Sequence, residues 1–497
     1  MKLVRFALNF ALGTVLSRIL GFVRDATVAY YFGASHISDA FFIAFRIPNS
    51  FRRLLGEGGF NAAFVPLYAK ALERGEEREF LSKVLGLYLL ANLAFTFLGV
   101  VLSEEIVSLI APGIRDGETF SLAVFMARFL FLYLLLVGVN ALFMGILNVR
   151  GRFFVPAFSQ GVFNGVFVVV LLLFAEPYGY PSLIAGVLLG GLLQVLVNVP
   201  LLLKERVSLS LSLNLDEEVK TLLRRLIPAL GGFGVNQLSL FIDTFLASFL
   251  RTGAISYLYY ANRLYQLPFG VVSVGVANSL LSILSRSSVS RRRELTEALR
   301  LVFLLTLPAS AGLFLLSEDI VMVVYRRGSF GDEDVFFSSG ALSIYSLGLV
   351  LFSFQKVLSA VFFSEGDTKT PVKASLLAVL SEGVLASFFA FLLKMGVFGL
   401  PMGTALSSFV GFAYLLFKVD VSPDWRSLLK SSLKGFLATT LMGALVFFLK
   451  RSELEPLMVV LTAVPLGTLA YFLSLVALRE ELSLRLLKGF VEKLRNP

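Results

Sequence analysis

Eight basic side chains interrupt long apolar stretches of this 497-residue chain. They are Arg18, Arg24, Arg46, Arg52, Arg53, Arg128, Arg263 and Lys356. A guanidinium group is costly in apolar surroundings unless it meets an anion or water, and its planar fork binds phosphate or carboxylate through paired hydrogen bonds. Six of the eight lie within residues 4–68 and 254–285. We therefore expect them to line a cavity for an anionic, phosphorylated substrate.

Carboxylates in the same stretches offer an alternative, in which these charges pair internally. Arg24 has Asp25 and Asp39 as candidate partners, and Arg53 precedes Glu57 by four residues, a spacing that places both on one helical face. The arginines outnumber these carboxylates, so internal pairing cannot neutralise the whole set.

A second group of polar residues indicates a cation site. Asp243 and Glu382 lie in the middle of apolar stretches, and Thr404 and Ser408 are four residues apart, so that their hydroxyls share a helical face. These groups could hold Na⁺ or exchange protons, and hydrogen bonding between helices is the alternative reading. The chain has no cysteine and one histidine, His36, which excludes thiolate and multi-histidine metal sites.

No enzyme motif accompanies these groups. Residues 56–59, Gly-Glu-Gly-Gly, lack the strand–turn–helix context of a nucleotide-binding loop, so ATP is not expected to drive the process directly. We expect a transporter rather than an enzyme, with no resident cofactor and with Na⁺ or H⁺ as the possible coupling ion.

The elements that position these residues are predicted to be membrane-spanning helices. Hydrophobic residues make up 57% of the chain and charged residues 16%, against about 25% charged in soluble domains. This composition excludes a soluble enzyme and predicts an all-α polytopic membrane protein, since one span needs about 20 apolar residues. We predict fourteen spans, at residues 4–31, 37–68, 80–102, 120–148, 155–175, 181–203, 220–250, 254–285, 295–316, 335–363, 370–393, 397–418, 428–450 and 456–478.

The distribution of lysine and arginine predicts how these helices cross the membrane. With the N-terminus in the cytoplasm, the cytoplasmic segments hold about 29 of the 44 basic residues and the outer loops about seven. Both termini are therefore expected inside, and the net charge of +10 reflects basic cytoplasmic loops rather than a nucleic-acid partner. The stretch 479–497 is amphipathic and is expected to lie on the membrane surface.

Three matches between distant segments indicate an internal repeat. Residues 44–47 match 261–264, residues 151–156 match 366–371, and Gly186 matches Gly403. Six helices per copy give both copies one orientation, which is a transporter architecture with the site between the lobes. Pro48 and Pro268 interrupt helices in matching positions, as expected beside such a cavity. We predict lobes at 1–204 and 205–420, two further helices at 421–480 and a cytoplasmic tail at 481–497.

Several motifs of the chain resemble the MurJ/MviN family of lipid II flippases, in the MOP exporter superfamily. The first seventy residues carry most of the resemblance, which extends over essentially the whole chain. The motifs are LSRILGFVRD at 16–25, FGA at 32–34, SDAFF at 38–42, RIPN at 46–49, RRLLGEG at 52–58, AFVP at 63–66, YYANRL at 259–264 and KTPVK at 369–373.

The resemblance implies a fold of two six-helix lobes with two extra helices that form a groove for a lipid tail. It implies transfer of lipid II, the undecaprenyl-pyrophosphate-linked peptidoglycan precursor, from the inner to the outer leaflet of the bacterial cytoplasmic membrane by alternating access. A monomer surrounded by membrane lipids is expected, and such a protein serves cell-wall biogenesis and cell shape.

The resemblance also assigns site residues. The substrate-binding positions that it implies are Ser17, Arg18, Arg24, Asp25, Asp39, Asn49, Arg52, Glu57, Asn164 and Arg263. The family's sodium site matches at Asp243, but Glu382 stands where an Asn is expected and Ala386 where an Asp is expected. The alternatives are a flippase for another undecaprenyl-linked glycan, a MATE-type cation-coupled antiporter, which would need an acidic or aromatic cavity, and a non-transporting scaffold.

Overall fold

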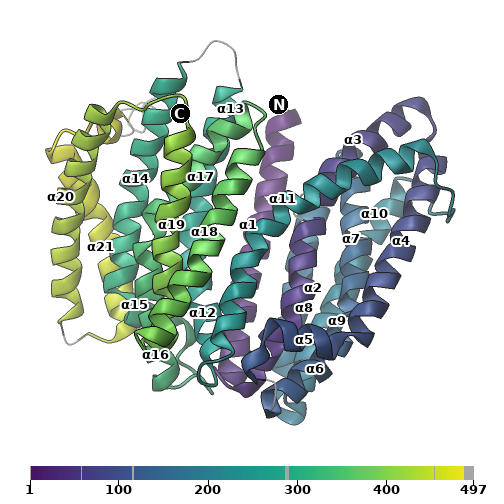
Figure 1. The fold of residues 1–497 in the computed structure, drawn as a ribbon, viewed down its shortest axis with the longest axis horizontal. Coiled ribbons are helices and arrows are strands. Elements are labelled where there is room, and N and C mark those ends of the chain that lie inside the picture. Colours follow the sequence, from purple (N-terminus) through teal and green to yellow (C-terminus); the bar gives the residue numbers. More distant parts are fainter. Residues whose placement is uncertain (1, 57–58, 115–116, 286–289, 453, 486–497) are drawn as a thin grey trace. The chain divides into compact units, whose positions relative to one another are not determined.

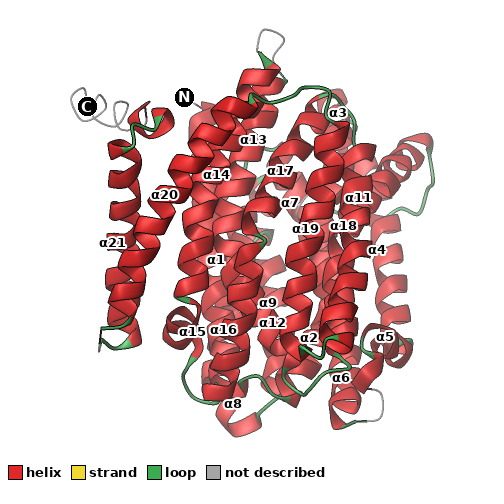
Figure 2. Ribbon diagram, turned by 60° about the vertical axis from the view of Figure 1, so that its left-hand side comes forward, coloured by secondary structure: helices red, strands yellow, loops and turns green. Residues whose placement is uncertain are grey.

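The computed structural model describes residues 2–56, 59–114, 117–285, 290–452 and 454–485. Within its helices, the side chains of residues 2–12, 14, 53–56, 59, 62 and 227–236 are not described. Every regular element of these ranges is a helix, and Figure 2 shows no strand among them. The chain forms two compact units, unit 1 with Met1–Ser256 and Arg327–Phe330, and unit 2 with Tyr257–Arg326 and Gly331–Pro497.

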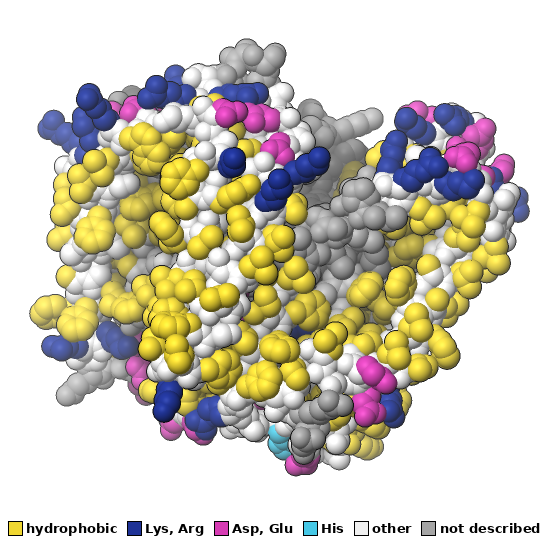
Figure 3. Space-filling model, in the orientation of Figure 1, with side chains coloured by type: hydrophobic (Ala, Val, Ile, Leu, Met, Phe, Trp, Pro, Cys, Tyr) yellow, Lys and Arg dark blue, Asp and Glu magenta, His cyan; other side chains and the backbone are white. Residues whose placement is uncertain are grey.

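Helices are the expected outcome for these sequences, because a lipid environment offers no water to satisfy open backbone groups. In the described part of the chain, ten helical segments are long and apolar enough to cross a membrane, and a bent pair at Asp332–Leu347 and Leu349–Ser364 makes an eleventh. All eleven coincide with predicted spans. The predicted all-α membrane fold is thus confirmed, and on the visible face of each unit hydrophobic side chains lie between two charged ends (Figure 3).

The other three predicted spans are helical too, although they are not among the eleven. They correspond to α1 (Lys2–Phe32), to α2 (His36–Gly56) with α3 (Gly59–Arg74), and to α11 (Glu217–Ala247). Each of these three segments includes residues whose side chains are not described. The count of fourteen spans stays a prediction.

Unit 1 is organised around α8 (Phe154–Tyr178), which packs between α1 and α9 (Pro181–Leu196). Its remaining helices are α4 (Glu77–Val101), α5 (Ser103–Ile110), η1 (Pro112–Ile114), α6 (Glu118–Leu130), α7 (Leu132–Val149) and α10 (Val199–Lys204) (Figure 1). The α8–α9 approach depends on glycine, since a Cβ on Gly186 would lie 2.1 Å from the ring of Phe167. Helix α11 belongs to unit 1, where it packs on α3. The boundary between the two repeated lobes, placed after residue 204, stays a prediction.

Unit 2 contains the rest of the chain. Its helices are α12 (Ala254–Pro268), which begins in unit 1, then η2 (Phe269–Ser273), α13 (Val274–Leu284), α14 (Arg291–Leu315), α15 (Ser317–Tyr325), α16 (Asp332–Leu347), α17 (Leu349–Ser364), α18 (Lys369–Ser387), η3 (Phe388–Leu392), η4 (Gly396–Phe398), α19 (Gly399–Lys418), α20 (Trp425–Lys450) and α21 (Pro456–Ala477). The irregularity expected near Pro268 is the π-helical turn η2. The matching interruption expected at Pro48 was wrong, because α2 continues through this proline. A Cβ on Gly403 would lie 2.3 Å from the backbone nitrogen of Ala386, so this glycine serves the α18–α19 contact as Gly186 serves α8–α9.

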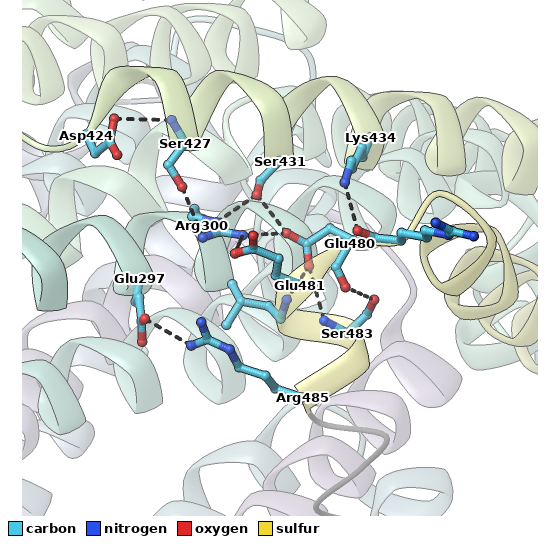
Figure 4. Close-up of polar contacts among 12 residues, drawn as sticks. Glu297, Arg300, Asp424, Ser427, Ser431, Lys434, Glu480, Glu481, Ser483 and Arg485 are labelled. Atoms are coloured by element: carbon cyan, nitrogen blue, oxygen red, sulfur yellow. Dashed lines mark hydrogen bonds and ion pairs between the residues drawn. The ribbon is translucent and has the colours of Figure 1, made fainter.

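A buried ion pair joins α14, α20 and the segment after α21 (Figure 4). Arg300 Nη2 lies 2.8 Å from Glu480 Oε1, and Arg300 Nε donates to Ser431 Oγ at 2.7 Å. Glu480 also accepts the backbone N–H groups of Leu482 and Ser483, which caps the short helix that follows. Burial raises the pKa of the Glu480 carboxyl, but hydrogen bonds from Ser431 and Arg300 outweigh it and leave that pKa below its usual value.

Candidate functional site

Arg24 is a buried cation on α1 with partners on α1 and α8. Its Nη2 lies 2.6 Å from Asp25 Oδ1, and its Nη1 donates to Asn164 Oδ1 at 3.1 Å. The guanidinium carbon lies 6.0 and 5.9 Å from the ring centres of Phe163 and Phe167, within the range of cation–π attraction. Internal pairing with Asp25, considered above as the alternative, therefore occurs for Arg24.

Asn164 and Ser17 complete this group. Asn164 Nδ2 donates to the Ser17 carbonyl at 3.1 Å, and the Ser17 hydroxyl donates to the Ala157 carbonyl at 3.0 Å. These bonds join α1 to α8 beside the arginine. Four of the predicted site residues, Ser17, Arg24, Asp25 and Asn164, are thus in one hydrogen-bonded group in unit 1.

Arg52 on α2 has a different set of partners. Its Nε donates to Asn49 Oδ1 at 3.0 Å, and its Nη1 donates to Gln160 Oε1 on α8 at 3.2 Å. The same Gln160 oxygen accepts from Gln194 Nε2 on α9 at 3.2 Å, and Gln194 Oε1 accepts from the Tyr133 hydroxyl at 3.4 Å. Neither glutamine was among the predicted site residues, although an uncharged amide inside an apolar span is itself a signal of a polar contact between helices.

Asp39 caps the start of helix α12. Its carboxylate accepts the N–H of Gly253 at 2.6 Å, the N–H of Ser256 at 2.9 Å and the Ser256 hydroxyl at 2.6 Å. An anion is favoured at a helix N-terminus, where backbone N–H groups lack partners. A cavity of about 320 Å³ adjoins this cap in unit 1, with Ser248, Arg251 and Thr252 in its wall.

The remaining predicted binding residues are Arg18, Arg263 and Glu57. Arg18 is exposed on α1. Arg263 belongs to unit 2, where its guanidinium carbon lies 5.7 Å from the ring centre of Tyr259. Glu57 lies outside the described residues.

Two of the proposed cation-site residues are in contact within unit 2. Thr404 Oγ1 donates to Glu382 Oε1 at 2.8 Å, and both side chains are buried in unit 2. The Ser408 hydroxyl donates to the Ala405 carbonyl of its own helix, and Asp243 is a buried residue of unit 1. Among the described residues there is no group of three or more histidine, aspartate or glutamate side chains arranged to hold a metal ion. Hydrogen bonding between helices accounts for the Thr404–Glu382 contact, and a Na⁺ or H⁺ site stays a prediction.

Comparison with known proteins connects this arrangement to one family. The family model described as "Lipid II flippase MurJ" matches residues 28–467. A "Probable lipid II flippase MurJ" of Aquifex aeolicus (strain VF5) is 44% identical over 494 residues, which cover 99% of this chain and 98% of the relative. A "Probable lipid II flippase MurJ" of Haemophilus influenzae is 34% identical, over 88% of this chain and 90% of the relative.

Solved structures agree with the sequence matches. A structure described as "Lipid II flippase MurJ, inward closed conformation" matches with a TM-score of 0.84 and 29% identity, over 95% of this chain and 99% of the other. An inward-facing multidrug resistance MATE family transporter of the MOP superfamily matches with a TM-score of 0.68 and 15% identity, over 88% of this chain and 98% of the other. The second match shows a common fold.

Proposed function

Because this chain belongs to the lipid II flippase MurJ family, we propose that it moves lipid II, the undecaprenyl-pyrophosphate-linked peptidoglycan precursor, from the inner to the outer leaflet of the bacterial cytoplasmic membrane. The observation that carries the proposal is the pair of arginines, Arg24 and Arg52, held inside unit 1 by side chains of one apolar helix. A diphosphate headgroup is the part of this substrate that such cations would recognise.

Different residues take different roles in this proposal. Arg24, Arg52 and Arg263 contact the diphosphate, with Arg18 and Asn49 beside it. Ser17, Asp25 and Asn164 orient Arg24 through the bonds described above, and Glu57 is a further substrate-binding residue that the family resemblance implies. Asp39 holds the start of α12.

The polar head crosses while the isoprenoid tail stays in lipid, because only the head carries charges that a bilayer rejects. In an alternating-access cycle the cavity opens to one side at a time as the two lobes rock. Both termini lie in the cytoplasm in this scheme, and the protein acts as a monomer. A membrane potential that is negative inside favours outward movement of an anion by about 2.3 kcal/mol per charge per 100 mV. Na⁺ or H⁺ could bias the cycle through Asp243, Glu382, Thr404 and Ser408.

Complementation of a bacterial strain depleted of its own lipid II flippase tests the proposal. The intact chain should restore growth and rod shape, and a variant with both Arg24→Lys and Arg52→Lys, which lack the planar fork, should fail while still reaching the membrane at a normal level. Failure of the intact chain, correctly inserted, would contradict the assignment. Rescue of a strain lacking a different undecaprenyl-linked glycan flippase, without rescue of the lipid II strain, would favour that alternative.

A further inference from the structure

One face of α8 meets both arginines. Gln160, Phe163, Asn164 and Phe167 follow the spacing i, i+3, i+4, i+7, so their side chains share one side of the helix. Gln160 holds Arg52 from α2, whereas Asn164 holds Arg24 from α1. The two holding residues are one helical turn apart, which is about 6 Å along the axis at 1.5 Å per residue.

We propose that Gln160 is a positioning residue that holds Arg52 one turn of α8 away from Arg24. The two arginines then bind two adjacent phosphoryl groups. The site therefore prefers diphosphate-linked to monophosphate-linked lipids. This inference rests on the proposed function, because it names the part of the same substrate, the diphosphate, that the arginine pair recognises. It adds a residue that neither the motifs nor the family resemblance selected.

The orientation of the Gln160 amide is itself determined by its neighbours. Only a carbonyl oxygen can accept from both Arg52 Nη1 and Gln194 Nε2. Gln194 is in turn held by the Tyr133 hydroxyl, and both of these side chains are buried, at 2% and 0% exposure. Buried hydrogen bonds of this kind leave the two glutamine side chains little rotational freedom. The series of hydrogen bonds from Tyr133 through Gln194 to Gln160 therefore fixes the direction from which Gln160 holds Arg52.

Arg24 and Arg52 each have an amide oxygen of α8 among their partners. Arg24 is paired with the Asp25 carboxylate and lies against two aromatic rings. For Arg52, the Asn49 and Gln160 oxygens are amide acceptors that direct the guanidinium plane. If Arg52 lost the Gln160 contact, its side chain would still be charged but would no longer be held in this position. It would then fail to contact the second phosphoryl group.

Equilibrium binding to the full-length protein in lipid nanodiscs tests the inference, with a short-chain polyprenyl diphosphate and the matching monophosphate as probes. Gln160→Met removes the acceptor at nearly constant volume. It should lower diphosphate affinity roughly tenfold, the loss of one charge-assisted hydrogen bond, and change monophosphate affinity less than about twofold. Gln194→Met keeps Gln160 but releases its amide, and should shift the same ratio in the same direction by less.

Gln355→Met is the matched control, since Gln355 lies in α17 of unit 2 and packs against Gly411. It should leave the diphosphate-to-monophosphate ratio unchanged. Two results would overturn the positioning role: equal losses of affinity for both probes in Gln160→Met, or an unchanged diphosphate-to-monophosphate affinity ratio in both Gln160→Met and Gln194→Met. The proposed function would stand in either case if the intact protein still complements. An intact protein that neither binds the diphosphate nor complements would instead overturn the proposed function.

Discussion

At the scale of single residues, the described charges inside unit 1 are organised by amide and carboxylate oxygens on neighbouring helices. The partners of Arg24 include a carboxylate, an amide and two aromatic faces, and those of Arg52 include two amides. Several of these partners are uncharged, so they orient the guanidinium groups at low electrostatic cost. The side chains are therefore placed in advance of any anion that reaches them.

Replacing Arg24 by lysine should separate charge from geometry. Lysine keeps the positive charge beside Asp25 but lacks the planar fork that reaches both Asp25 and Asn164. We expect flipping of lipid II in reconstituted vesicles to fall roughly tenfold or more, equivalent to one charge-assisted hydrogen bond. Alanine is a poorer probe, because a buried Asp25 without its partner would cost about 3–5 kcal/mol of stability. Activity equal to that of the wild type would show that the fork is not used.

The Glu480 carboxyl predicts an acid limit to stability. Burial raises its pKa, but the bonds from Ser431 and Arg300 dominate and lower it. A group with a lowered folded pKa stabilises the protein above its unfolded pKa, near 4.3 for glutamate, and that contribution is lost as the pH falls further, through the folded pKa. The apparent melting temperature in detergent should therefore decrease as the pH is lowered below about 4.3.

Glu480→Gln provides the comparison for this prediction. It should melt at a lower temperature at neutral pH, since a buried Arg300 loses its counter-charge, and it should show a shallower drop on acidification. Parallel melting curves for the two proteins across this pH range would rule out Glu480 as the titrating group.

At the scale of elements, the helices were predictable because apolar runs of about 20 residues leave the backbone few alternatives in lipid. The described parts of all fourteen predicted spans are mainly helical, and a π-helical turn follows Pro268. The Gln160–Gln194 contact and the Arg300–Glu480 pair were not predicted. Each joins helices far apart in the chain, and a single sequence shows the polar residue but not the partner that it meets.

The cap on α12 leads to a prediction about one element. Asp39→Asn replaces one carboxylate oxygen by an amide nitrogen, which cannot accept, so either the bond from Gly253 N–H or the two bonds from Ser256 are lost. The loss of a cap costs about 1–2 kcal/mol. We expect faster hydrogen exchange in the first turn of α12, residues 254–257, than in the unchanged protein. Ser279→Ala, on α13, is the control, and equal protection in Asp39→Asn and wild type would argue against the cap.

At the scale of the whole molecule, the chain is a helical membrane protein of the family that its motifs resembled, and composition alone had already excluded a soluble enzyme. The motifs and the family identify the substrate as lipid II. Physical argument from the charged residues predicted only an anionic, phosphorylated ligand. Orientation in the membrane rests on the bias of lysine and arginine toward one set of loops.

Single cysteines test that orientation without background, because the chain has none of its own. Thr252 lies in a predicted outer loop and Ser290 in a predicted cytoplasmic loop, and both are exposed. In intact spheroplasts, an impermeant thiol reagent should label Thr252→Cys and should label Ser290→Cys only after permeabilisation. The reverse pattern would place both termini outside.

The central claim is that the arginine pair carries the diphosphate-linked head of lipid II across the membrane, and a flipping measurement on the purified protein tests it most directly. Fluorescent lipid II is placed in the inner leaflet of proteoliposomes, and its arrival in the outer leaflet is followed by an impermeant quencher or enzyme. The account predicts transfer by the intact protein, and at least about a hundredfold slower transfer when Arg24→Lys and Arg52→Lys are combined, since two forks worth tenfold each are lost. Transfer by the double variant at the rate of the intact protein would contradict it.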